Sequence, residues 1–395
     1  MTTRAPLGIA AMGLVTPLGT GAAEVARTLF EGTREGLVAR DDLCAHRTVR
    51  VGAVTAELPT IGSRNDALMR AATEQIRDAV AGAVDRHGPA RIGVVVGTST
   101  SGMAEHERAR QDRKRTGAWP SGNHYGQWEL GALADGVAST LGLQGPAYSI
   151  ATACSASAKV FASGRRLIEA GICDAVVVGG ADTLCSMTVS GFSSLDAVSR
   201  GLCNPFSRNR DGINIGEGAA AFLMTRDAAP VQLLGCGECS DAHHISAPHP
   251  EGEGAYQAMR MALEDAELRP QDVVYVNLHG TGTPLNDAME AKAVFRLLGD
   301  AAPCSSTKSM TGHALGAAGA IEAAFTWLTL HPDHNPDGRL PPHLWDGQAD
   351  EGIPQIALAP PGARFEQRGR PAILTNSFAF GGNNVVLAFG SGGPG

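Results

Sequence analysis

The feature that most constrains the fold is a pattern that occurs twice. A valine-rich run at 91–97 is typical of a buried strand and ends in G-T-S-T at 97–100. A second run at 273–279 leads into G-T-G-T at 280–283. Each half also carries a later turn of small residues that leads into a helix. The repetition predicts an internal duplication of an α/β unit, which would bring the two turns together at the seam between the halves.

The composition fits a large globular chain. With 395 residues, 43% of them hydrophobic, it can bury a substantial core, and no apolar run approaches the roughly 18 residues of a membrane span. Residues 7–15 are predicted as a first strand, and 21–31 and 64–86 as helices. The N-terminal run lacks the pattern of a signal peptide, so we expect a cytoplasmic protein whose eight cysteines are thiols. A net charge of −8 argues against nucleic acid as a partner.

The small-residue turn of the first half centres on Cys154, within A-T-A-C-S-A-S-A at 151–158. Apolar residues at helical spacing follow it, and Gly171 offers a stop before a buried strand at 174–180. We therefore expect Cys154 at the start of a helix, where free N–H groups and the helix dipole lower the pKa of a thiol and leave some thiolate near neutral pH. The alternative is a buried structural cysteine in a packing motif of small residues.

Two histidines lie in turns of the second half. His279 ends a predicted strand, and His313 precedes a Gly/Ala-rich helix that contains Glu322. Either histidine alone could be a satisfied structural residue. Glu322 is costly to bury unpaired, and the nearest obvious cation in the sequence is Lys308. Two histidines in similar turns make a functional site with Cys154 the stronger interpretation.

The segment 101–143 does not follow the alternation of strand and helix and is predicted to be an insertion over one end of the sheet. It contains a basic run at 108–115, with Glu105, Glu107 and Asp112 close by. Because acidic residues interleave with the basic ones, a solvated helix face is favoured over a docking surface.

Four motifs, in order along nearly the whole chain, resemble the elongating, decarboxylating β-ketoacyl-acyl-carrier-protein synthases of the thiolase superfamily. They are T-A-C-S at 152–155, H-G-T-G-T at 279–283, Lys308 with T-G-H at 311–313, and N-S-F-A-F-G-G at 376–382. The resemblance implies a thiolase-like α/β fold, in which duplicated βαβαβαββ halves form a five-layer αβαβα arrangement. Residues 1–228 would carry the nucleophilic cysteine, and residues 229–395 would carry the two histidines.

The resemblance also implies a reaction. Cys154 would accept an acyl chain from an acyl-carrier protein and then join it to malonyl-carrier protein, giving 3-oxoacyl-carrier protein and CO2. His279 and His313 would bind the malonyl thioester oxygen, on which enolate charge grows in the transition state. Lys308 and Glu322 would form an ion pair that orients the His313 turn.

Further residues receive roles from the same resemblance. The N–H groups of Cys154 and Phe380 would form the oxyanion hole. Substrate or pantetheine would contact Thr281, Thr283, His244, Ser246, Phe378, Phe380 and Thr100, the last as the pocket floor. Phe378 and Phe380 would lie on a gate loop, in which Ala379 replaces a usual glycine. Asn383, just after that loop, replaces a usual threonine.

The form of the His279 motif, with Ala379 and Asn383, looks closest to the ketosynthases of aryl-polyene pigment clusters. That subgroup implies unsaturated, aryl-primed substrates and a heterodimer with a cysteine-less homologous subunit. Ordinary fatty-acid elongation implies a homodimer. In both cases the acyl group arrives on the phosphopantetheine of acyl-carrier protein, so the resemblance implies no cofactor and no metal.

Three other interpretations are weaker. A degradative thiolase needs a second catalytic cysteine near the C-terminus, whereas the last cysteine here is Cys304. A non-catalytic chain-length-determining partner subunit should lack the nucleophile that Cys154 supplies. A zinc module could use the C-x-x-C at 236–239 and the histidines at 243–244, but a strand there would turn the two thiols apart, and no second C-x-x-C exists.

Overall fold

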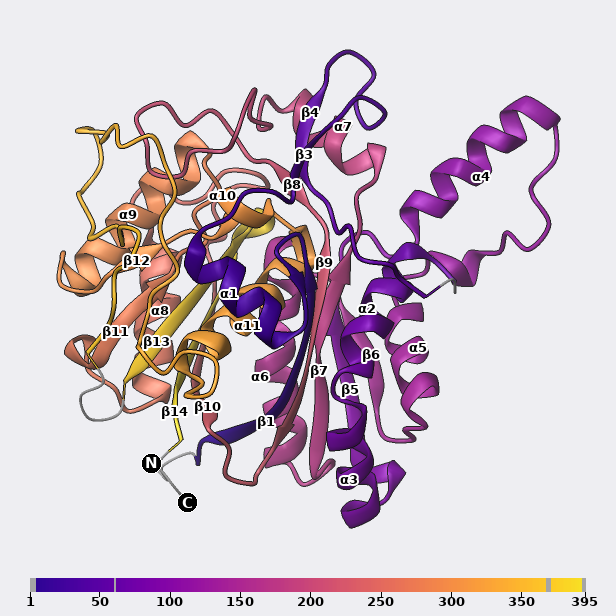
Figure 1. Ribbon diagram of the computed structural model, residues 1–395, viewed down its shortest axis with the longest axis horizontal. Helices are drawn as coiled ribbons and strands as arrows, with labels where there is room; N and C mark the ends of the chain where they lie inside the picture. The colour runs from indigo at the N-terminus through magenta and orange to yellow at the C-terminus, as the bar shows by residue number, and fades with distance from the viewer. Residues whose placement is uncertain (1–4, 60–61, 367–370, 393–395) are drawn as a thin grey trace.

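The fold is built on two half-sheets of five strands that meet edge to edge (Figure 1). The computed structural model describes residues 5–59, 62–366 and 371–392. The first half-sheet has the order β6 (Ala147–Ile150), β5 (Ile92–Gly97), β7 (Ala175–Asp182), β9 (Gly218–Thr225), β1 (Leu7–Thr16). The second has the order β12 (Cys304–Ser305), β11 (Val273–Asn277), β13 (Ala372–Ala379), β14 (Asn383–Ser391), β10 (Val231–Ser240).

The two half-sheets follow the same plan. In the first, β5 pairs in parallel with β6 and β7, and β9 pairs antiparallel with β7 and β1. In the second, β11 pairs in parallel with β12 and β13, and β14 pairs antiparallel with β13 and β10. The halves join where Leu7 and Gly8 of β1 pair with Leu233 and Gln232 of β10. The predicted duplication is confirmed in strand order and in strand direction.

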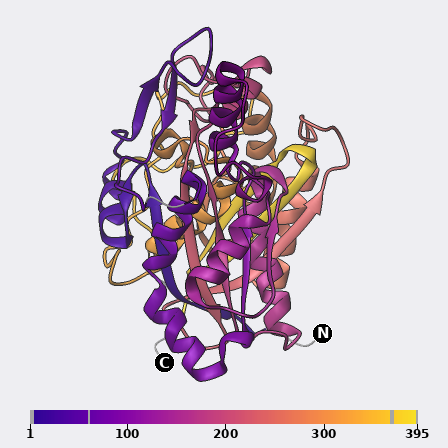
Figure 2. The same ribbon diagram turned by 90° about the vertical axis from the view of Figure 1, so that its right-hand side faces the viewer.

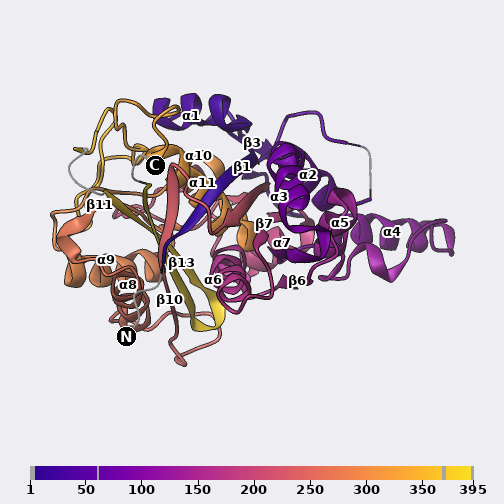
Figure 3. The same ribbon diagram turned by 90° about the horizontal axis from the view of Figure 1, so that it is seen from below.

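Helices complete five layers, α-β-α-β-α, as Figures 1 and 3 show from two sides. The outer face of the first half-sheet carries α2 (Arg64–Glu74), α3 (Arg77–His87) and α5 (Ala132–Leu141). The outer face of the second carries α8 (Glu253–Asp265) and α9 (Pro284–Leu298). The middle layer holds α6 (Ala156–Glu169) and α11 (Ala318–Leu330). The thiolase-like architecture expected from the sequence is therefore present.

The middle layer is the most deeply buried part of the molecule. Every residue of α11 is buried, which explains why its sequence is apolar around the whole helix apart from Glu322 and two threonines. Gly319 marks a close approach between α11 and α6, because a Cβ atom there would lie 2.7 Å from the nitrogen of Ala158. The two helices that follow the functional turns thus pack directly on one another.

The predicted single helix at 64–86 is divided into α2 and α3. At the break, Ile76 leaves the helical conformation with φ −109° and ψ 6°. The side chain of Gln75 accepts a hydrogen bond from the nitrogen of Leu14 (3.0 Å) and donates one to the carbonyl oxygen of Leu14 (3.1 Å). A tertiary contact with β1 therefore interrupts a sequence pattern that is locally helical.

The segment predicted as an insertion forms α4 (Met103–Thr116) and α5. In Figures 1 and 3, α4 extends away from the body of the molecule, and Figure 2 views this side face on. Its base contacts α7 (Ser186–Ser194). Smaller elements border the sheets: β2 (Gly19–Thr20), α1 (Ala22–Glu31), α10 (Lys308–Thr311), and a three-stranded sheet of β3 (Leu37–Arg40), β4 (Val49–Gly52) and β8 (Ile215–Gly216). Within the described ranges, no helix has the length and apolarity needed to cross a membrane.

Candidate active site

Cys154 lies in a strained turn that the second half repeats. A 3-10 turn at Ala153–Ser155 precedes α6, and a 3-10 turn at Leu315–Ala317 precedes α11. Both turns open on a non-glycine residue with positive φ, 50° at Ala153 and 48° at Leu315. Cys154 and Gly316 therefore occupy equivalent positions, and only the first half carries a nucleophile there.

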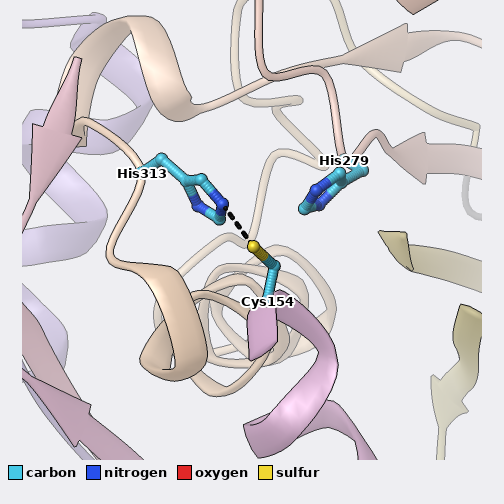
Figure 4. A group of neighbouring side chains, drawn as sticks. All are labelled: Cys154, His279 and His313. Atoms are coloured by element: carbon cyan, nitrogen blue, oxygen red, sulfur yellow. Dashed lines mark hydrogen bonds between the residues drawn. The ribbon is translucent and has the colours of Figure 1, made fainter. Parts of the chain in front are cut away.

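The structure brings Cys154 together with both histidines. Figure 4 shows the three side chains facing one space, with His313 Nε2 3.1 Å from Cys154 Sγ. The two imidazole rings are 5.3 Å apart and nearly perpendicular. One ligand atom from each of the three residues lies within 4.8 Å of the others. All three side chains are buried.

Backbone contacts with β8 fix the turn that carries His313. The nitrogen of His313 donates to the oxygen of Asn214 (2.7 Å), and the nitrogen of Gly216 donates to the oxygen of His313 (2.9 Å). Gly312 has φ 70°, and a Cβ atom there would lie 2.9 Å from the oxygen of Ile215. Glycine is required at this position for both reasons.

Two buried carboxylates hold the loop that carries His279. Glu290 accepts hydrogen bonds from the nitrogens of His279 (2.8 Å) and Gly280 (2.7 Å). Asp287 accepts one from the nitrogen of Gly282 (3.1 Å). Burial raises the pKa of Glu290 to about 7. These contacts give both acidic residues a structural role in shaping the loop.

The ion pair of Lys308 and Glu322 forms as predicted and lies beside His279. Both side chains are almost completely buried. The ammonium of Lys308 donates to the carbonyl oxygen of His279 at 2.6 Å and lies 3.5 Å from His279 Nδ1. An ammonium has only donors to offer, so its position favours the His279 tautomer with the proton on Nε2. The resemblance links the pair to the His313 turn. The side chain of Lys308 contacts His279, and its carbonyl oxygen accepts a hydrogen bond from the nitrogen of Gly312 (2.9 Å), so the link to the His313 turn stays a prediction.

Both histidines are neutral at physiological pH. Burial lowers the pKa of His279 and of His313 well below the usual value, and the charge of Lys308 lowers it further. A neutral imidazole that carries its proton on Nε2 can donate a hydrogen bond to a developing negative charge.

The environment of Cys154 differs from the sequence-based expectation. Burial raises the pKa of the thiol to about 12, and the positive charge of Lys308 offsets this only in part. The position at a helix start predicted a lowered pKa, and this prediction is wrong. Loss of water around the sulfur outweighs the favourable field of the helix, so the resting cysteine is a thiol next to His313.

A cavity of about 290 Å³ leads to these three residues. The predicted site residues that line it are Cys154, His279, His313, Thr281, Thr283, Ser246, Phe378 and Phe380. Lys308 and Glu322 lie behind His279, outside the lining. The cavity lining also includes Phe192, Leu195 and Asp196 from α7 and the turn that follows it, which the sequence did not single out.

Two residues predicted to contact substrate do not line this cavity. His244 is exposed, and its Nδ1 accepts hydrogen bonds from the nitrogens of Ser246 and Ala247, both at 3.2 Å. Thr100 is buried, and its hydroxyl donates to Asp182 at 2.8 Å. His244 therefore shapes the loop that brings Ser246 to the cavity, and the assignment of Thr100 to the pocket floor stays a prediction.

Asp182 is a buried carboxylate that sequence reasoning missed. It ends β7, is inaccessible to solvent, and accepts hydrogen bonds from the nitrogens of Ser99 (2.8 Å) and Thr100 (2.7 Å). It also accepts one from the nitrogen of Ala317 (3.1 Å), in the turn just after His313. Asp182 thus ties the first half to the His313 turn of the second. A lone carboxylate at the end of an otherwise apolar strand was the available signal.

The C-x-x-C pair does not form a metal site. Cys236 and Cys239 lie three residues apart on β10, so their side chains point to opposite faces of the strand. In the part of the chain that the structure describes, the only group of three histidine, cysteine or acidic side chains close enough to hold an ion is Cys154, His279 and His313.

Comparisons with known proteins define the class to which this fold and site belong. Residues 5–229 match the model of the β-ketoacyl synthase N-terminal domain, and residues 231–342 match that of the C-terminal domain. The chain belongs to the β-ketoacyl synthase family, whose members are condensing acyltransferases.

Particular relatives are similar over most of their length. The chain is 34% identical over 337 residues to a 3-oxoacyl-[acyl-carrier-protein] synthase 2 of Staphylococcus aureus, covering 81% of each. A 3-oxoacyl-[acyl-carrier-protein] synthase 2 of Synechocystis is 33% identical over 325 residues, covering 75% of this chain and 74% of the relative. Among solved structures, a ketosynthase (ApeO) of Xenorhabdus doucetiae in complex with its chain length factor (ApeC) matches with TM-score 0.91 and 42% identity, covering 99% of both chains.

Proposed function

We propose that this protein is a β-ketoacyl-acyl-carrier-protein synthase that uses Cys154 as its nucleophile. It transfers an acyl chain from acyl-carrier protein to Cys154 and condenses it with malonyl-carrier protein by decarboxylative Claisen condensation. The observation that carries the proposal is the meeting of one thiol and two neutral imidazoles at the end of a single cavity. The cytoplasmic location, the absence of a cofactor and the boundary near residue 228 belong to the same proposal.

In the first half-reaction the thiol must lose its proton as it attacks. A pKa of about 12 leaves almost no thiolate at neutral pH, and His313 Nε2 is the base within hydrogen-bonding distance of the sulfur. His313 accepts the thiol proton while sulfur bonds to the acyl carbon. It then returns the proton to the departing pantetheine thiolate. Cys154 and Phe380 both line the cavity, and their backbone N–H groups are the proposed donors to the oxyanion.

In the second half-reaction malonyl-carrier protein enters the same cavity. Breaking the bond to its carboxylate releases CO2 and leaves an enolate, whose charge lies on the thioester oxygen. Nε2–H groups of His279 and His313 stabilise that charge. The enolate carbon then bonds to the acyl carbon, and the carbon–sulfur bond breaks. The cysteine thiolate that leaves takes up one proton from water.

Thr281 and Thr283 are the proposed contacts for pantetheine. Their hydroxyl oxygens are 3.0 Å apart, and both residues line the cavity together with His279. Phe378, Phe380 and Ser246 complete the proposed path of the carrier arm.

Two features together support a more specific proposal for the acyl substrate and for the partner subunit. The form of the His279 motif resembles ketosynthases of aryl-polyene clusters, and ApeO, which was solved with its chain length factor, matches across 99% of the chain. We propose that this chain pairs with a homologous, cysteine-less subunit and extends unsaturated acyl chains. Its own Cys154 separates it from such a non-catalytic subunit.

Acyl labelling tests the proposal. Purified wild type and Cys154→Ala are incubated with carrier protein that bears an acyl chain and are then digested. The mass of the peptide around position 154 is measured by mass spectrometry. Wild type should gain the acyl mass on Cys154, and Cys154→Ala should gain none. Equal labelling of the two proteins elsewhere in the chain would refute the assignment of the nucleophile. A panel of saturated and polyene acyl-carriers, offered with malonyl-carrier protein, then identifies the chain that is extended.

A further inference from the structure

The projecting helix α4 is anchored to the body through carboxylates near its base. Glu105 accepts a hydrogen bond from the nitrogen of Arg64, at the first turn of α2 (3.2 Å). Glu107 accepts hydrogen bonds from the nitrogens of Ser186 (2.9 Å) and Met187 (2.6 Å), at the first turn of α7. Two acidic residues just before the basic run therefore point inward, and each accepts hydrogen bonds at the start of a different helix.

Glu107 is the side chain that satisfies the start of α7. The residue at the N-cap position of α7, Cys185, makes no capping hydrogen bond with its side chain. The first N–H groups of a helix need acceptors, and a carboxylate also interacts favourably with the helix dipole. The N–H groups of Ser186 and Met187 at the start of α7 are thus satisfied from α4.

The other end of α7 forms part of the cavity mouth. Phe192, Leu195 and Asp196 line the cavity that leads to Cys154, and the 59% exposure of Leu195 places this end of α7 where the cavity opens to solvent. The ring of Phe192 lies 5.6 Å from the ring of Phe380, on the predicted gate loop, with 38° between the ring planes. One short helix therefore links the base of α4 to the aromatic pair at the mouth.

We propose that Glu107 is a positioning residue that holds the mouth of the active-site cavity in place from α4, through α7. Without its carboxylate the first turn of α7 loses its acceptors, and Phe192 loses its fixed position against Phe380. The mouth then widens, and the carrier arm is guided less well. The inference rests on the proposed function only in assuming that the carrier protein delivers its acyl chain through this cavity.

The test compares Glu107→Ala with Glu105→Ala, a matched control on the same helix that removes one acceptor at the start of α2, whose own capping box at Ser63 stays in place. Each protein is treated separately with iodoacetamide and with a bulky maleimide, and modification of the Cys154 peptide is followed by mass spectrometry. We expect Glu107→Ala to raise the ratio of the maleimide rate to the iodoacetamide rate at least threefold, and Glu105→Ala to leave it unchanged. An unchanged ratio in Glu107→Ala, or an equal change in both variants, would overturn the proposal.

A second variant and a second readout keep the test decisive. Glu107→Gln retains one acceptor oxygen and should fall between wild type and Glu107→Ala, so it serves if the alanine variant is misfolded by circular dichroism. In the condensation assay, Glu107→Ala should raise the KM for acyl-carrier protein at least threefold with kcat within twofold. A fall in kcat alone would count against a role at the mouth. The labelling needs no carrier protein, so it stands even if the proposed reaction is wrong.

Discussion

The two active-site histidines face the same space but are held differently. His279 has the ammonium of Lys308 beside its Nδ1, which keeps its proton on Nε2. His313 contacts the sulfur through Nε2, and its buried Nδ1 has no hydrogen-bond partner among the described residues. His313 can therefore change tautomer between the half-reactions, as an acceptor first and a donor later, whereas His279 is fixed as a donor.

This difference predicts that the two alanine variants separate the half-reactions. His279→Ala should acylate Cys154 within about threefold of the wild-type rate but lose condensation by a factor on the order of 10² to 10³, the usual cost of one oxyanion donor. His313→Ala should slow both steps, because it removes the base as well as a donor. Single-turnover acylation, followed by mass, and CO2 release from malonyl-carrier protein measure the steps. His46→Ala, an exposed histidine outside the cavity lining, is the control. Equal acylation rates in the two active-site variants would contradict this division.

The pKa of Cys154 gives a prediction with a definite sign. The thiolate fraction of a group with pKa about 12 rises tenfold per pH unit until the pH approaches that value. Carbamidomethylation of Cys154 by iodoacetamide should therefore accelerate about tenfold per unit between pH 7 and pH 10 without reaching a plateau. A plateau near pH 8 would show that the field of the helix start dominates over burial.

For single residues, the sequence indicates which groups react better than it indicates their protonation states. Cys154, His279 and His313 are visible because each follows a distinctive turn motif. The direction of the Cys154 pKa shift is not visible, since a helix start is evident in the sequence and the depth of burial is not. Asp182 was missed for a related reason, because its partners come from two segments that are far from it and from each other in the sequence.

Among the elements, the gate loop shows where movement is permitted. Ala379 has φ −107° and ψ 156°, an extended conformation that any residue adopts, so the alanine there causes no strain. The positive φ angles belong to Gly381 (80°) and Gly382 (73°). A hinge in this loop therefore depends on these two glycines and not on residue 379.

Substitution at Gly381 tests this location of the hinge. A Cβ atom there would have only the side chain of Asn383 nearby, at 3.7 Å, so Gly381→Ala adds backbone strain without a clash. The strain should lower the free energy of unfolding by about 1 kcal/mol and slow acylation by long chains several-fold. Ala379→Gly is the control and should change the acylation rate less than twofold. Thermal unfolding and single-turnover acylation provide the measurements, and a larger effect in the control would place the hinge at residue 379.

Element boundaries were predicted well where the sequence alone determines them and poorly where a distant contact does. The strands before the two G-T-x-T motifs were found because their apolar runs and glycine ends are local signals. The break between α2 and α3 was not, because Gln75 is a good helix former whose side chain is bound by the backbone of β1. The role of α7 depends likewise on Glu107 from another helix.

For the whole molecule, duplication explains why a site can form at the seam. The equivalent turns lead into α6 and α11, which cross at Gly319, so a nucleophile in one half necessarily meets the His313 turn of the other. The repeated motifs predicted this meeting. They did not predict that β1 and β10 would join the half-sheets, since the pairing of Leu7 with Leu233 has no local signature.

The free edge of the first half-sheet is where we expect the proposed second subunit to bind. Within the described structure β6 is the last strand of its half-sheet and pairs only with β5. The carbonyl oxygens of Pro146 and Ile150 accept hydrogen bonds from the nitrogens of Val94, in β5, and of Thr98, just after it. Because successive residues of a strand direct their backbone groups to opposite sides, the N–H and C=O groups of Ser149 point away from β5. Such an edge is a template for a strand of another chain.

Ser149→Pro removes the outward donor and leaves the ladder with β5 intact, because proline is tolerated in an edge strand when its missing N–H is not part of the sheet. We expect the variant to keep the wild-type circular dichroism spectrum but to lose at least tenfold in affinity for the second subunit, or for a second copy of itself. Ser149→Ala keeps the donor and should pair normally. Analytical ultracentrifugation of each variant measures the association. Wild-type affinity in Ser149→Pro would place the interface elsewhere, with the projecting helix α4 as the next surface to test.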